Sequence, residues 1–83
     1  MKLHEGLESR LKKVYEPSSF ISMKFKGNDI GFKTDDNGNP ILLFIGKKTV
    51  NGSIKGQRYA RTLKRDGNGN VYKDHWDLKG KST

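Results

Sequence analysis

The stretch that decides the fold is residues 57–78, QRYARTLKRDGNGNVYKDHWDL. Its centre, Asp66–Gly69, consists of residue types that favour a tight turn, because Asp, Asn and Gly tolerate the backbone angles that turns require. Aromatic and β-branched residues alternate with polar ones on both sides of this turn, which is typical of half-buried strands. The stretch therefore predicts an antiparallel hairpin with strands at 57–65 and 70–78.

The side chains of this hairpin favour one pairing of its strands. Placing Tyr59 opposite Trp76 also places Arg61 opposite Asp74 and leaves a four-residue loop at 66–69. A shift of one residue would instead set aromatic side chains against charged ones. One face of the hairpin is then mostly apolar and is predicted to be core, and the other is polar and basic.

Upstream of the hairpin, the same alternation predicts two more strands, at 19–26 and 29–34, and a short apolar run predicts a third at 41–46. The run Ile41–Ile45 is apolar at every position, which indicates a strand covered on both of its faces. The connections between the five strands are too short for parallel crossovers, so we expect consecutive strands to pair antiparallel as a meander.

The N-terminal region has a helical period instead. Its apolar residues recur at helical spacing: Leu3, Leu7, Leu11, Val14 and Tyr15. Pro17 cannot continue a helix, and it disfavours the helical conformation at Glu16. We therefore expect one amphipathic helix over residues 3–15.

Together these patterns predict a single α+β domain over residues 1–83. The N-terminal amphipathic helix packs on a five-stranded antiparallel β-meander. The sheet is expected to stay open or to curl only partly, because a lone helix needs an apolar sheet face to cover. Residues 80–83 are expected to form a frayed tail.

The composition excludes several functional classes. The chain has 83 residues and no cysteine, which rules out disulfides, Cys-ligated zinc and thiol catalysis. No apolar run approaches the roughly 20 residues of a membrane helix, and no signal peptide is visible, so we expect a cytoplasmic protein without a membrane partner. His4 and His75 show no metal-ligand spacing, and no cofactor motif is present, so we expect neither a metal nor a cofactor.

The net charge of +8 is concentrated in one segment. Residues 47–65 carry seven Lys or Arg side chains and no Asp or Glu. A concentrated positive potential attracts polyanions, so we expect a small basic binding module, rather than an enzyme, whose partner is RNA or DNA. The candidate contacts are the basic side chains of this segment and of the hairpin, with one aromatic residue for base stacking: Lys47, Lys48, Lys55, Arg58, Tyr59, Lys64, Arg65 and Lys73. Trp76 is a second candidate for stacking.

Two other hypotheses stay open. The first is a protein-interaction or accessory domain with an acidic protein partner, since no recognised RNA- or DNA-binding motif is present. The second is a metal-independent ribonuclease, in which His75 moves the 2′-hydroxyl proton while Arg58 and Lys73 stabilise charge on the phosphate. A helix followed by an antiparallel sheet resembles, in element order, the small basic ribonuclease toxins of bacteria. The oligomeric state is left open.

Overall fold

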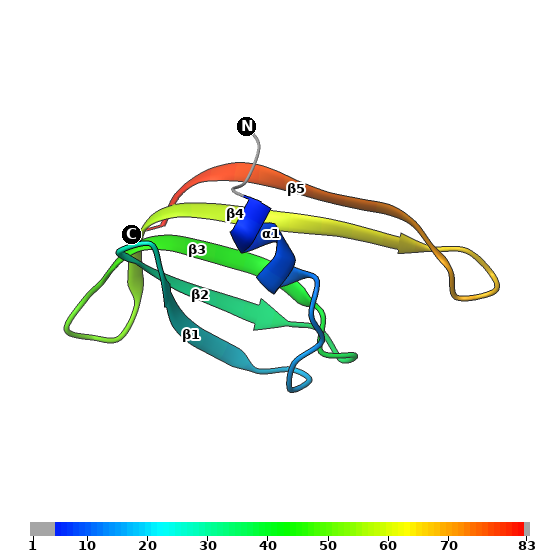
Figure 1. Ribbon diagram of the computed structural model, residues 1–83, viewed down its shortest axis with the longest axis horizontal. Helices are drawn as coiled ribbons and strands as arrows, with labels where there is room; N and C mark the ends of the chain where they lie inside the picture. Colours follow the sequence, from blue (N-terminus) through cyan, green and yellow to red (C-terminus); the bar gives the residue numbers. More distant parts are fainter. Residues whose placement is uncertain (1–4, 83) are drawn as a thin grey trace.

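The computed structural model describes residues 5–82, which form one helix and five strands (Figure 1). The elements follow in the order α1 (Glu5–Leu11), β1 (Phe20–Phe25), β2 (Asn28–Thr34), β3 (Pro40–Lys48), β4 (Ile54–Arg65) and β5 (Val71–Ser82). Each strand pairs antiparallel with the next, so β1 and β5 are the two edges of the sheet. The structure confirms the predicted open five-stranded antiparallel meander with one helix.

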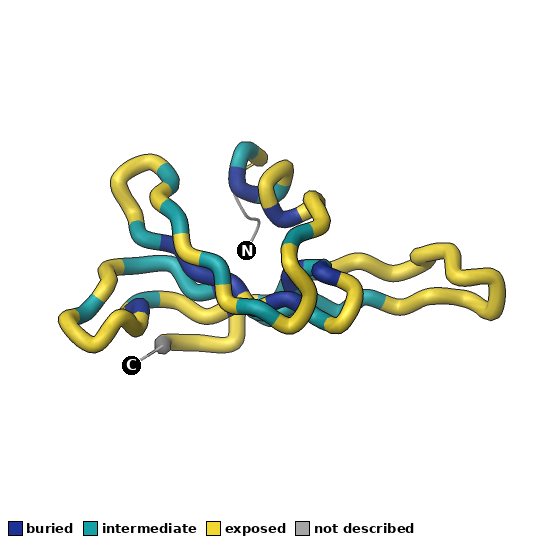
Figure 2. Tube along the Cα trace, turned by 90° about the horizontal axis from the view of Figure 1, so that it is seen from below, coloured by how far each residue is buried: buried dark blue, intermediate teal, exposed yellow. Residues whose placement is uncertain are grey.

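Helix α1 lies on one face of the sheet, here called the inner face, and no other described element covers the opposite, outer face (Figure 2). The core forms where α1 meets the inner face, and its buried side chains are Leu7, Leu11, Ile30, Phe32, Leu43 and Tyr59. Phe32 and Leu43 are fully buried and lie opposite each other on β2 and β3. Burying a side chain of this size stabilises the fold by about 1.5–3 kcal/mol.

Helix α1 is shorter than the sequence predicts. The predicted helix spans residues 3–15, of which 3 and 4 lie outside the described residues, whereas α1 ends at Leu11. Leu7 and Leu11 are buried as the periodicity requires, but Val14 is 67% exposed. The helical period therefore correctly identifies Leu7 and Leu11 as core residues, but it is wrong for Val14 and does not identify the end of the helix.

Contacts of Tyr15 with distant residues replace the last predicted helical turn. The Tyr15 backbone N–H donates to the carbonyl of Gly38 at 2.8 Å, and its hydroxyl donates to the carbonyl of Arg10 at 2.7 Å. The Tyr15 ring packs edge to face on Phe32, with the two centroids 4.9 Å apart. Since a helical backbone could not make these contacts, the chain leaves the helix after Leu11.

Three hairpin loops, at 35–39, 49–53 and 66–70, share one backbone geometry. In each loop the first residue donates its N–H to the carbonyl of the fifth, and the fourth residue donates to the carbonyl of the first. The fourth residue is always a glycine, with φ angles of +86°, +86° and +84° that other residues rarely adopt. The repeated Asn-Gly step thus closes the last three hairpins in the same way.

The pairing of β4 with β5 differs from the predicted register by two residues. Arg61 lies opposite Trp76, rather than opposite Asp74. Two features together explain the difference. The Asp66 carboxylate accepts two backbone N–H groups, the second from Asn70, and so closes a five-residue loop instead of a four-residue one. An irregularity in the pairing between Lys64 and Arg65 shifts the register by one further residue. From Tyr59 to Lys64 the shift is two residues, and it keeps each of these side chains on its predicted face.

Both β4 and β5 are longer than predicted. β4 begins at Ile54, and β5 continues to Ser82, so the frayed tail expected at 80–83 is wrong for its described part. The early start of β4 gives the end of β5 a strand to pair with, since Gly56 lies opposite Ser82. The ends of β1, β2 and β3 agree with the predicted strands to within two residues.

Candidate nucleic-acid interface

Strand alternation divides the basic segment 47–65 between the two faces of the sheet. Lys47 and Lys55 lie directly opposite each other, in the same alternation as the buried Leu43, and therefore on the inner face. Lys48 and Lys64 are an odd number of residues from the inner-face residues of their own strands, and therefore lie on the outer face. The basic side chains of this segment do not form one surface.

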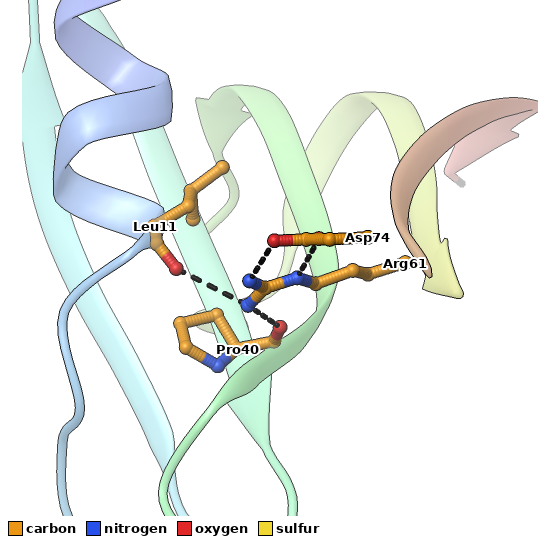
Figure 3. A network of polar contacts seen from close by, with 4 residues as sticks. All are labelled: Leu11, Pro40, Arg61 and Asp74. Carbon is orange, nitrogen blue, oxygen red and sulfur yellow. Dashed lines mark hydrogen bonds and ion pairs between the residues drawn. The ribbon is translucent and has the colours of Figure 1, made fainter. Parts of the chain in front are cut away.

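Arg61 does not belong to the basic surface, because its side chain is only 6% exposed (Figure 3). Its guanidinium donates two parallel hydrogen bonds to the Asp74 carboxylate, from Nε at 2.6 Å and from Nη2 at 2.7 Å. Its Nη1 donates to the carbonyls of Leu11 and Pro40, at 3.3 and 3.1 Å. The hydrogen bonds from Arg61 hold the pKa of Asp74 below its usual value. Arg61 thus joins α1, β3 and β5 and serves the fold.

The two aromatic residues considered for base stacking, Tyr59 and Trp76, lie on the inner face. Tyr59 is 2% exposed and belongs to the core, so its ring offers no surface to a base and its predicted role is corrected. Trp76 packs partly buried against the core, and the Arg61 guanidinium lies over its ring, 5.7 Å from the centroid. Both rings therefore lie apart from the cations of the outer face.

The outer face carries an excess of positive charge. By strand register, its basic side chains are Lys24, Lys33, Lys48, Arg58, Lys64 and Lys73.

Two carboxylates share this face, and both have partners. Asp29 accepts the backbone N–H of Lys48 at 2.7 Å and lies 3.8 Å from the Lys24 ammonium. The N–H of Lys48 and the nearby lysine charges lower the pKa of Asp29. Asp77 lies 2.8 Å from Nε2 of His75.

The β4–β5 hairpin extends beyond the other strands as a two-stranded arm, which is exposed throughout residues 64–75 (Figure 1, Figure 2). Lys64 and Lys73 lie directly opposite each other on the outer face of this arm. Nearby, Nη1 of Arg65 donates to the carbonyl of Gly69 at 3.2 Å. Like charges directly opposed on two strands destabilise a sheet.

The residues of the predicted ribonuclease site come together only in part. His75 is exposed and lies opposite Thr62, with Lys73 two residues away on the same face. Arg58 lies opposite Gly80, and four residues along β4, about 13 Å, separate it from Thr62. The structure thus places Lys73 beside His75 but keeps Arg58 apart from both.

Two aromatic residues of the outer face, Phe20 and Phe44, are absent from the sequence-based candidates. Their ring centroids are 6.3 Å apart, and Phe20 is 46% exposed. Phe20 could have been predicted from the alternation of β1. Ile21, Met23 and Phe25 pack on the core, so Phe20 belongs to the opposite face. Phe44 could not be singled out in the same way, because it lies in the continuous apolar run Ile41–Ile45. The prediction that this run is covered on both faces is wrong, since no described element lies over its outer side.

No protein-family model, curated protein or solved structure matches the chain. Among residues 5–82, no group of three or more His, Cys, Asp or Glu side chains is placed to hold a metal ion. Within that same part of the chain, no helix is both long and apolar enough to cross a membrane.

Proposed function

We propose that this protein is a small module that binds nucleic acid through the outer face of its sheet. The observation that carries the proposal is the direct opposition of Lys64 and Lys73 on the exposed arm. A backbone phosphate bound between them would replace like-charge repulsion with two charge-assisted contacts.

The distribution of charge supports a polymer rather than a single small anion. The cations of the outer face come from all five strands, beginning with Lys24 on β1 and ending with Lys73 on β5. They are spread over a molecule whose longest extent is 43 Å. A chain of phosphates can contact several such positions at once, and these contacts require no particular base sequence.

The test compares two double variants that remove the same charge from opposite faces. Lys64→Gln/Lys73→Gln removes a directly opposed pair from the outer face, and Lys47→Gln/Lys55→Gln removes a directly opposed pair from the inner face. Binding is measured by fluorescence anisotropy with labelled single-stranded RNA and duplex DNA, at about 50 and 200 mM salt.

The outer-face variant is expected to lose roughly tenfold or more in affinity, and the slope of log K against log salt should fall by about 1.4–1.8. The inner-face variant should bind like the wild type. Equal losses in both variants would show attraction by net charge alone and would contradict a dedicated interface. A wild-type protein that binds neither nucleic acid at the higher salt would favour the alternative of an acidic protein partner.

A further inference from the structure

Phe20 and Phe44 form an aromatic platform on the outer face, although their strands are not neighbours. Gly31 of β2 lies between them, directly opposite Phe44. A Cβ atom at Gly31 would lie 2.5 Å from Cζ of Phe20 and 2.8 Å from Cδ1 of Ile54. The missing side chain therefore lets the Phe20 ring extend across the β2 backbone. Ile54, which is 4% exposed, has its Cδ1 atom beside the same space over Gly31.

The Phe20–Phe44 platform is accessible to a flat ligand. The two rings are tilted by 44° to each other rather than stacked, so neither covers the face of the other. Phe20 keeps 46% of its surface exposed. An open hollow borders this ring, and its lining residues are Ser18, Ser19, Phe20, Lys33 and Thr34. Exposed apolar surface of this kind marks a contact site when polar groups surround it.

A cation lies beside each ring of the platform. Lys33 lies directly opposite Phe20 on β2, and Arg58 lies directly opposite Phe44 on β4. Side chains in opposed positions of neighbouring strands are roughly 5 Å apart at their Cβ atoms. A nucleotide joins a flat base to a phosphate through a single sugar. A ring with a cation next to it therefore matches both the base and the phosphate of a nucleotide.

We infer that the Phe20–Phe44 platform stacks the bases of single-stranded nucleic acid, while Lys33 and Arg58 contact the neighbouring phosphates. This inference rests on the proposed nucleic-acid function and adds the class of ligand, single strands in preference to duplexes. In a duplex the bases stack on one another, so their faces are closed to the platform. The outer-face cations can contact the phosphates of either form.

The test is a substitution that removes the flat ring from the outer face. Phe20→Leu keeps an apolar side chain but cannot stack a base. Phe25→Leu is the matched control, because Phe25 belongs to the same strand and packs on the inner face. Anisotropy is measured with a labelled single-stranded RNA and with a duplex of the same length, after circular dichroism has shown that each variant is folded.

Phe20→Leu is expected to lower the affinity for the single strand about tenfold and to leave the affinity for the duplex unchanged. Phe25→Leu should bind both like the wild type. A folded Phe20→Leu protein with wild-type single-strand affinity would overturn the stacking site, and so would an equal loss for both nucleic acids. The proposed function would still stand if Lys64→Gln/Lys73→Gln weakens binding, so the two failures are distinguishable.

A second variant tests the same site without removing the ring. Phe20→Trp keeps a flat aromatic surface at the edge of the sheet, so it is expected to bind single strands at least as tightly as the wild type. A loss of single-strand binding in the folded Phe20→Trp protein would contradict stacking at this position.

Discussion

Arg61 and Asp74 are joined by two parallel hydrogen bonds of 2.6 and 2.7 Å between β4 and β5, although they are not opposite each other in the register. The pair is diagonal, which long side chains can span. Through Nη1 the same guanidinium reaches the carbonyl of Leu11, the last residue of α1. An arginine of the basic segment thereby fixes the helix to the sheet.

The first prediction concerns the stability that Arg61 provides. Arg61→Met should lower the free energy of unfolding by about 3 kcal/mol, because it leaves the Asp74 carboxylate and two backbone carbonyls without their donor. Arg58→Met is the control, because Arg58 is on the same strand but exposed on the outer face. It should change the free energy of unfolding by less than about 0.5 kcal/mol. Urea unfolding measures both. Equal effects of the two substitutions would contradict the structural role of Arg61.

The second prediction follows from the lowered pKa of Asp74. The folded protein holds this pKa below the ordinary value of 3.8, so the unfolded chain takes up the proton at a higher pH than the folded one. The resulting stability is fully present above about pH 4 to 5 and is lost as the pH falls through the folded-state pKa. Urea unfolding between pH 6 and 2.5 should show this loss.

Asp74→Asn should reduce this acid dependence without abolishing it. Asp29 has a lowered pKa as well, through the backbone N–H of Lys48. For Asp35, burial raises the pKa, but hydrogen bonds from backbone N–H groups outweigh it, so this pKa is also lowered. An unchanged acid dependence in Asp74→Asn would show that Asp74 contributes no such stability.

The third prediction compares two aspartates in loops of identical hydrogen bonding. Asp35 and Asp66 each accept two backbone N–H groups within their loops. The loop of Asp35 is tied to the body of the protein through Tyr15 and Gly38, whereas the loop of Asp66 is the exposed tip of the arm. We expect Asp35→Ala to cost about 1–2 kcal/mol and Asp66→Ala clearly less, because a tip can fray locally.

Chemical unfolding of the two variants, side by side, measures this difference. Hydrogen exchange of the loop amides provides the control, since faster exchange in the mutated loop shows that each substitution has removed the hydrogen bonds of its own loop. A larger loss of global stability from Asp66→Ala than from Asp35→Ala would contradict the prediction.

The fourth prediction concerns the close approach of β3 and β4 at Gly46. This residue lies opposite Gly56, and a Cβ atom on it would meet the carbonyl oxygen of Lys55. Because a backbone atom cannot move aside like a side-chain tip, Gly46→Ala should cost about 1–3 kcal/mol. Gly67→Ala is the control, since its Cβ would have no neighbour within 4 Å, and it should be nearly neutral. Thermal unfolding of both variants decides the matter, and a neutral Gly46→Ala would contradict the close approach.

Local patterns were sufficient to predict the strands and the antiparallel order of the sheet. Alternation with period two and short Asn-Gly turns are properties of neighbouring residues, so they can be read from the chain without knowledge of its partners. The same alternation correctly placed Tyr59 on the apolar side of the last hairpin. The end of α1 could not be predicted in this way, because Tyr15 leaves the helix to contact Gly38, which lies 23 residues away.

The sequence by itself determined how much positive charge the segment 47–65 carries, since charge is a sum over residues. Only the tertiary structure decided which of these charges a ligand can reach, because exposure depends on what packs across the sheet. Arg61 became a buried hydrogen-bond donor, and the segment was divided between two faces. The platform of Phe20 and Phe44 also exists only in three dimensions, since Gly31 on the strand between them provides the space that brings their rings together.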